Sequence, residues 1–283
     1  MRRLFGLTAG ADRVRATFWL LDAPDSLEVQ SRRNPDGSGI GFLDPAGAPV
    51  LDKQPEPAFE DEEFRHEARR AESTTFVAHV RLASVGGRTL GNTHPFAMRG
   101  RIMAHNGGLG ELPRLDEQLG RYGDLVLGDT DSERYFALIT QMTDAHGGDL
   151  GAGITAAARW IGARLPVSSL NCVVATGQEL WALRYPAQHA LHVLERPPGR
   201  RGLRVRSATS SVHVPALDAA RSVVVASERL DGESDWRMLE PGELVHVRAD
   251  LGIESAVVLP DPPDRLVLLG PAHFDSSRLR WLS

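Results

Sequence analysis

Arg101-Ile102-Met103-Ala104-His105-Asn106-Gly107 is the stretch that decides the fold, because it joins an apolar run to an asparagine–glycine pair. The run from 101 to 105 is typical of a buried strand. Both residues of the pair tolerate positive φ, so the pair predicts a hairpin turn directly after that strand. A second apolar run, Thr75–Val80, predicts another buried strand, which is followed at once by Arg81.

The rest of the chain predicts strands on either side of a pair of helices. Helices are expected from Phe59 to Ala71, from Asp131 to Gly147, where a glycine pair ends the pattern, and from Ile154 to Leu165. Further strands are expected at 5–7, 40–42, 169–175, 179–185, 190–194, 222–226 and 243–247, with a hairpin across 176–178. This order favours segregated layers, and therefore an α+β domain over residues 1–250 with a loosely packed C-terminal extension at 251–283.

Composition excludes several classes of protein. The 283 residues include 32 basic and 37 acidic side chains, a net charge of −5, which leaves no basic excess for a nucleic-acid backbone. No run approaches the ~20 apolar residues of a membrane span, and the apolar run at the N-terminus is too short for a signal core. The single cysteine, Cys172, excludes an internal disulfide framework. We therefore expect a cytoplasmic protein that binds neither nucleic acid nor membrane.

Several short motifs have structural explanations when each is taken alone. Thr130-Asp131-Ser132-Glu133 fits a helix capping box, in which Thr130 caps the helix and Glu133 reaches back. Arg81 fits a surface charge, and Cys172 lies in an apolar run where a core residue is favoured over a nucleophile. The histidines form no zinc-binding motif, and the sequence contains no G-x-S-x-G nucleophile elbow.

Read together and in order, the short motifs indicate a known family. The blocks are Arg3-Leu4-Phe5-Gly6, Asn34-Pro35-Asp36-Gly37, His79-Val80-Arg81, Asn92-Thr93-His94-Pro95-Phe96, Ala104-His105-Asn106-Gly107 and Thr130-Asp131-Ser132-Glu133. This series resembles the class II glutamine amidotransferases of the N-terminal-nucleophile hydrolase superfamily. It is most similar to the bacterial branch that includes the γ-glutamyl amide hydrolases of ergothioneine biosynthesis. The resemblance covers residues 1–250 and implies an αββα sandwich, with two antiparallel sheets between helical layers.

The resemblance also implies a role for each matched residue. In the family an N-terminal cysteine attacks the side-chain amide of glutamine, releasing glutamate and ammonia or an amine. The Asn106 side chain and the Gly107 backbone N–H would form the oxyanion hole. Arg81 would bind the α-carboxylate of the substrate, Asp131 its α-ammonium, and Ser84 would be a further carboxylate donor. No metal or organic cofactor is implied, and a separate subunit could accept the ammonia.

One departure from the family concerns the reaction itself, because Arg2 stands where the nucleophilic cysteine belongs. A guanidinium has no lone pair available for attack at neutral pH, and its bulk should prevent removal of Met1. Ser38 and Leu82 stand where aromatic residues are usual, which predicts a roomier wall beside the site.

Three hypotheses therefore remain open. The first is a glutamine amidotransferase or γ-glutamyl hydrolase that is impaired as written, because Arg2 leaves the nucleophile position vacant. The second is a non-catalytic protein that binds glutamine or a γ-glutamyl compound, or that scaffolds a partner. The third is a different N-terminus, produced by another start codon or by processing.

Overall fold

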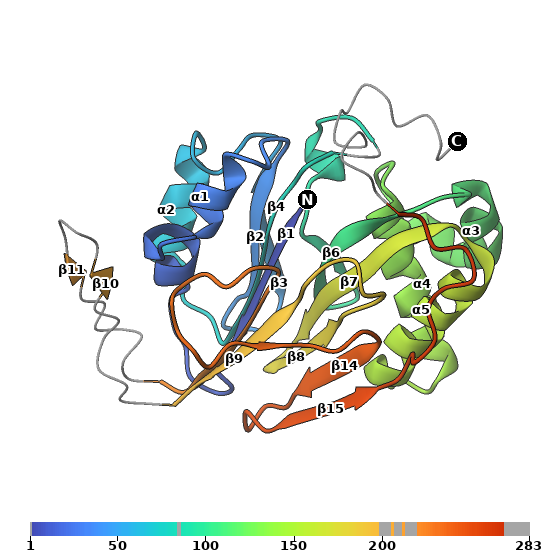
Figure 1. The fold of residues 1–283 in the computed structure, drawn as a ribbon. Coiled ribbons are helices and arrows are strands. Elements are labelled where there is room, and N and C mark those ends of the chain that lie inside the picture. The colour runs from blue at the N-terminus through green and yellow to red at the C-terminus, as the bar shows by residue number, and fades with distance from the viewer. Residues whose placement is uncertain (1, 84–85, 198–204, 207–210, 213–219, 269–283) are drawn as a thin grey trace.

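The computed structural model describes residues 2–83, 86–197, 205–206, 211–212 and 220–268, and its strands form two large antiparallel sheets (Figure 1). The seven-stranded sheet has the order β13 (Arg237–Met238), β9 (His192–Arg196), β12 (Ser222–Ala226), β1 (Arg3–Thr8), β4 (Thr75–Val80), β2 (Ser38–Leu43) and β3 (Pro49–Gln54). The six-stranded sheet has the order β15 (Ile253–Val257), β14 (Glu243–Val247), β8 (Glu179–Leu183), β7 (Val167–Thr176), β6 (Arg101–Leu109) and β5 (Phe96–Met98). A separate two-stranded pair is formed by β10 (Val205–Arg206) and β11 (Ser211–Val212).

Helices cover the outer face of each sheet (Figure 1). The seven-stranded sheet is covered by α1 (Leu27–Ser31), α2 (Glu62–Arg70) and the π-helix η1 (Phe18–Asp22). The six-stranded sheet is covered by α3 (Leu112–Leu119), α4 (Asp131–Ala145) and α5 (Leu150–Arg164). Short 3₁₀ helices η2 (Leu90–Asn92) and η3 (Gly120–Leu125) lie in the connections.

Three hydrophobic cores hold these four layers together. Two cores lie between a sheet and its helices, and the third lies between the sheets, where Leu4 and Val77 of one sheet join Ala104 and Val173 of the other. The sheets approach closely at Gly6, where an added Cβ would lie 2.6 Å from a Val173 methyl group. The arrangement is an αββα sandwich and confirms the predicted α+β fold class.

Most of the predicted elements are present. The predicted strand at 75–80 is β4, the predicted hairpin across 176–178 joins β7 to β8, and the helix pair is α4 and α5. The predicted loop at 197–220 falls largely on residues outside the described part of the chain.

The turn predicted at Asn106-Gly107 is wrong. Strand β6 continues through both residues to Leu109, and Asn106 lies opposite Asn171 of β7. The long β6–β7 ladder keeps the chain extended, so tertiary pairing overrides the local preference of the pair for a turn.

The expectation of a loosely packed extension is also wrong for residues 253–267. Strand β15 pairs with β14 along its whole length, Leu266 forms a bridge with Val167, and the Val267 N–H donates to the Val167 carbonyl at 2.8 Å. The domain boundary at residue 250 stays a prediction. No helix in the described ranges combines the length and apolar character needed to cross a membrane.

Candidate active site

Arg2 reaches into the space between the sheets, one residue before β1 begins. Leu4 belongs to the inter-sheet core, and Arg2 continues the same face two residues earlier. Its guanidinium donates from Nη1 to the Gly107 carbonyl at 2.6 Å and from Nε to the Leu82 carbonyl at 3.2 Å. The residue is 5% exposed. The side chain that the resemblance matches to the nucleophile therefore contacts Gly107, one of the two residues predicted for the oxyanion hole.

Asp131, the first residue of α4, supplies a buried carboxylate to this region. Its Oδ2 accepts the Leu109 N–H at 3.0 Å and its Oδ1 accepts the Ser132 N–H at 2.9 Å. Thr130 caps the helix by accepting the Glu133 N–H, as the capping box predicts. Glu133, however, accepts the Gly128 N–H at 2.7 Å, so its expected return contact is replaced by one to the preceding loop.

The charges of Arg2 and Asp131 are coupled. Burial lowers the pKa of Arg2, and the nearby Asp131 carboxylate opposes that change. Asp131 is fully buried, and burying a charge is tolerated when an opposite charge accompanies it. This carboxylate is therefore already engaged with a cation from the same chain.

Arg81 directly follows β4, and main-chain carbonyls hold its side chain in place. Its guanidinium donates to the Gly86 and Gly87 carbonyls at 3.2 and 3.1 Å. Burial, followed by repulsion from Arg2, lowers the pKa of Arg81 to about 10, while Asp36 and Asp131 oppose the change. Arg81 therefore remains a cation at neutral pH, in electrostatic contact with both Arg2 and Asp131.

Asn106 differs from the asparagine opposite it in β7. The Asn171 amide accepts the Tyr185 N–H and donates to the His189 and Ala190 carbonyls. The Asn106 side chain, on a residue 3% exposed, has no hydrogen bond to any residue that the structure describes. An amide held in a strand without a partner can donate to a ligand.

Gly107 is required by the close approach of β6 and β7. A Cβ at this position would lie 1.8 Å from the Ser169 carbonyl oxygen. The Gly107 carbonyl faces Arg2, and the Leu109 N–H, two residues on, faces Asp131. Main-chain groups two residues apart in a strand point to the same edge, so we expect the Gly107 N–H on this edge too.

The His105 side chain lies on the face of β6 opposite to that of Asn106, where it contacts α4 and β7. Its Nε2 lies 3.0 Å from the Ser169 carbonyl, which only accepts, so Nε2 carries the proton. Its Nδ1 then accepts the Ser132 hydroxyl at 2.9 Å. Burial lowers the pKa of His105 to about 4, so the ring is neutral at physiological pH.

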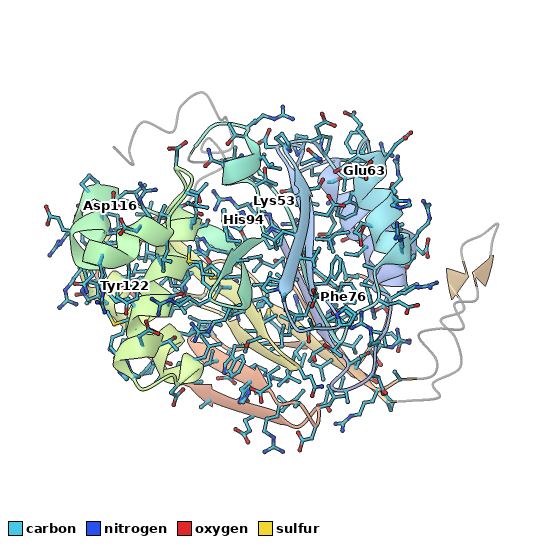
Figure 2. The ribbon with its side chains drawn as sticks, turned by 180° about the vertical axis from the view of Figure 1, so that it is seen from behind. Lys53, Glu63, Phe76, His94, Asp116 and Tyr122 are labelled. Carbon is cyan, nitrogen blue, oxygen red and sulfur yellow. The ribbon has the colours of Figure 1, made fainter. Side chains whose placement is uncertain are left out.

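Two further histidines next to the site have no role in the sequence-based assignment. His79 of β4 stacks on His94 with ring centroids 4.2 Å apart, and both residues are almost completely buried. Neither ring has a hydrogen-bond partner of normal geometry among the described residues, and burial lowers both pKa values well below the usual range. Both histidines stand in quoted motifs, but only the fold shows that they stack. Figure 2 labels His94 and Lys53. The Lys53 Nζ donates hydrogen bonds to the carbonyls of Thr93 and Pro95, the residues on either side of His94.

Other predicted residues fall elsewhere. Ser84 lies outside the described residues. Cys172 belongs to the core under α4, where burial raises the pKa of its thiol to about 12, consistent with a core residue. Ser38 is not part of a wall beside the site, because its hydroxyl faces the α2 side and contacts the Glu56 carbonyl and Asp61.

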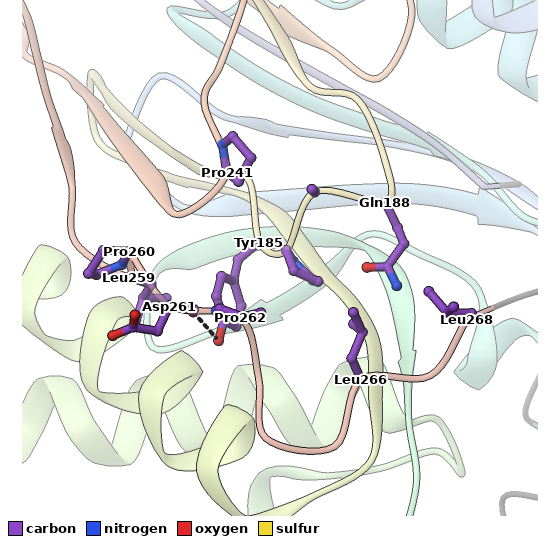
Figure 3. A pocket seen from close by; sticks show the side chains of 11 residues that line it. Tyr185, Gln188, Pro241, Leu259, Pro260, Asp261, Pro262, Leu266 and Leu268 are labelled. Atoms are coloured by element: carbon purple, nitrogen blue, oxygen red, sulfur yellow. Dashed lines mark hydrogen bonds between the residues drawn. The ribbon is translucent and has the colours of Figure 1, made fainter.

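A separate apolar cavity lies away from this site (Figure 3). It has a volume of about 420 Å³ and is lined by residues 185–188, by Pro241 and by residues between 259 and 268. Tyr185 donates its hydroxyl to the Asp261 carbonyl at its edge. None of the site residues named above lines it. Within the ranges that the structure describes, no three His, Cys, Asp or Glu side chains form a group able to hold a metal ion.

Similarity to solved structures defines the class of fold. A glutamine aminotransferase class-II domain protein from Silicibacter pomeroyi matches 90% of this chain and 98% of its own with a TM-score of 0.60 at 22% identity. Glutamine phosphoribosylpyrophosphate amidotransferase from B. subtilis matches 92% of this chain with a TM-score of 0.65 at 20% identity. This chain spans 50% of that protein. The fold is that of the N-terminal-nucleophile glutamine amidotransferases.

The chain belongs to the class II glutamine amidotransferase family, whose model matches residues 25–259. Among its relatives is the γ-glutamyl-hercynylcysteine sulfoxide hydrolase of Mycobacterium tuberculosis, 30% identical over 246 residues, which cover 83% of this chain and 88% of the relative. The predicted family is therefore confirmed, and its γ-glutamyl hydrolases are among the relatives.

Proposed function

We propose that this protein binds the amino-acid end of a γ-glutamyl compound and does not hydrolyse its amide. The observation that carries the proposal is the Arg2 guanidinium, buried against the Gly107 carbonyl at the position that the resemblance matches to the nucleophile. The family resemblance supplies the ligand class, and Arg81, Asn106 and Asp131 supply groups that suit it.

The binding part of the proposal rests on complementary charge. An α-carboxylate suits the Arg81 guanidinium, because a planar fork of donors matches two carboxylate oxygens. An α-ammonium suits Asp131, whose carboxylate has capacity for further donors besides the Leu109 and Ser132 N–H groups. The amide of Asn106, which has no hydrogen-bond partner among the described residues, suits the γ-carbonyl oxygen of the ligand.

The chemical part of the proposal rests on the absence of a nucleophile at position 2. A guanidinium cannot attack an amide carbon at neutral pH. Cys172 does not replace it, because its side chain lies in the core beneath α4, 3.7 Å from the Tyr135 hydroxyl. A site that releases no ammonia has no need of a subunit to accept it, and the cytoplasmic location stays a prediction.

Ammonia release from L-glutamine tests the proposal. We expect none above background from the full chain or from Arg2→Ala, and a clear rate from Arg2→Cys, with intact mass measured to confirm that Met1 has been removed. Removing a catalytic nucleophile typically costs about 10⁶-fold in rate, so even partial restoration is easily measured.

Two results would count against the proposal. Ammonia release by the unaltered chain that Arg81→Met abolishes would make it an enzyme, the first hypothesis drawn from the sequence. A folded and correctly processed Arg2→Cys protein that stays silent would mean that the site does not hold an amide in position for attack.

A further inference from the structure

Arg2 changes the charge of the site as well as its chemistry. Its guanidinium is fixed by carbonyl oxygens from two separate elements, Leu82 after β4 and Gly107 in β6. These contacts hold a permanent cation against the edge of β6 at Gly107, the residue that follows Asn106. A cysteine at this position would be neutral as a thiol, so the arginine adds one positive charge.

Among the described residues, the charged side chains coupled to Arg2 and Arg81 do not cancel this addition. Arg2 and Arg81 both face the Asp131 carboxylate, and Asp36, which also faces Arg81, lies 3.6 Å from the Arg88 guanidinium. These five described side chains, three arginines and two aspartates, together carry a net charge of +1. The neighbouring histidines His79, His94 and His105 are neutral, because burial lowers the pKa of each ring.

A ligand with one net negative charge would complete this cluster. L-Glutamate carries two carboxylates and one ammonium, whereas L-glutamine is a neutral zwitterion. Hydrogen bonds from a charged donor to a carboxylate are about twice as strong as those between neutral groups, and they are strongest where water is excluded. The oxyanion-hole residues suit a permanent carboxylate for the same reason that they suit a developing oxyanion.

We propose that the site prefers an α-amino acid with a free γ-carboxylate, such as L-glutamate, over the γ-amide, and that Arg2 sets this preference. The inference rests on the proposed function, because Arg81 and Asp131 must hold the amino-acid end for the γ-group to reach Arg2 and Asn106.

Isothermal titration calorimetry on the full chain tests this preference with L-glutamate and L-glutamine as ligands. We expect the Kd for glutamate to be at least about tenfold lower than that for glutamine, since a charged partner in a pocket typically gives discrimination of this order. Arg2→Met, which keeps an unbranched but shorter side chain and removes the charge, should lower the ratio to about one or below. Arg2→Lys should keep glutamate ahead, and Arg248→Met, which alters an exposed arginine on another surface, should leave the ratio unchanged.

The other outcomes separate this inference from the proposed function. Equal or tighter binding of glutamine by the unaltered chain, or a glutamate preference that survives in Arg2→Met, would overturn the inference and leave the proposed function standing. Binding by Arg2→Met alone would overturn both the inference and the proposed function, because Arg2 would then occupy the place of the ligand in the unaltered chain. If neither amino acid binds to any folded variant, the proposed function itself fails.

Discussion

The two faces of β6 use their polar side chains in different ways. On the helix side, His105 is held by Ser132 of α4 and by the Ser169 carbonyl of β7, so both ring nitrogens have partners. On the inter-sheet side, Asn106 makes no side-chain hydrogen bond with the described residues, although the residue is only 3% exposed. One face supports the fold, and we propose that the other presents a polar group to a ligand.

Asp131 and Arg2 differ in the main-chain groups that hold them and in the charge that they carry. Asp131 is anchored by two main-chain N–H groups at the start of a helix, where a negative charge is favoured. Arg2 is anchored by two carbonyl oxygens and brings a positive charge to the same place. The groups that we propose to hold the ligand therefore lie near a guanidinium, which cannot act as a nucleophile at neutral pH.

The largest expected effect comes from separating the charges of Asp131 and Arg2. Asp131→Asn should lower the free energy of unfolding by about 3–5 kcal/mol, because it leaves a buried guanidinium without its carboxylate. Arg2→Met in the same chain should recover part of that loss. Urea unfolding of the two single variants and the double variant measures the coupling, and strictly additive effects would show that the two charges do not interact.

Acid should destabilise the supporting face of β6. The pKa of His105 is about 4 in the folded chain and 6.5 in the unfolded chain, so the unfolded chain binds more protons between these values. The stability contributed by the neutral ring is therefore fully present above pH 6.5 and is lost as the pH falls towards 4, by about 3 kcal/mol. Unfolding measured across this range should show a smaller loss in His105→Asn. Burial of His79 and His94 lowers stability at acid pH in the same direction. If His105→Asn loses as much stability between pH 6.5 and 4 as the unaltered chain does, the lowered pKa of His105 is contradicted.

Replacing Arg81 should affect binding more than any other change at the ligand-holding side chains. Arg81→Met removes the fork for the α-carboxylate, and we expect affinity for glutamate to fall by about 100-fold or more. Arg248→Met is the control, because Arg248 is an exposed arginine on another surface. Calorimetry that finds equal losses in both variants would argue against a specific carboxylate site at Arg81.

Replacing Asn106 should have the smallest effect on stability. This replacement is also the sharpest test of the difference between the two faces of β6. Asn106→Ala should change the free energy of unfolding by less than about 0.5 kcal/mol while weakening glutamate binding about tenfold, because its amide has no partner in the described structure. Asn171→Ala, directly opposite, should cost several times more stability, since three hydrogen bonds are lost. Similar losses at both positions would mean that Asn106 supports the fold.

The sequence predicts most of the elements, and it proposes site residues whose orientation only the structure gives. Local patterns are enough for β4, for the hairpin of β7 and β8, and for the Thr130 cap of α4. Local patterns fail at Asn106-Gly107, because β6 pairs there with β7, a strand far away in the sequence. Local conformational preference does not predict such a pairing. The stacking of His79 on His94 and the direction of the Arg2 side chain depend in the same way on segments far apart in the chain.

The central claim is that the site holds an amino acid without reacting with it, and equilibrium dialysis with isotopically labelled L-glutamine tests it most directly. The full chain should bind the label saturably at high concentration, Arg81→Met should not, and the label recovered from the bound fraction should still be glutamine. Recovery of the label as glutamate with release of ammonia, or the absence of saturable binding, would contradict the claim.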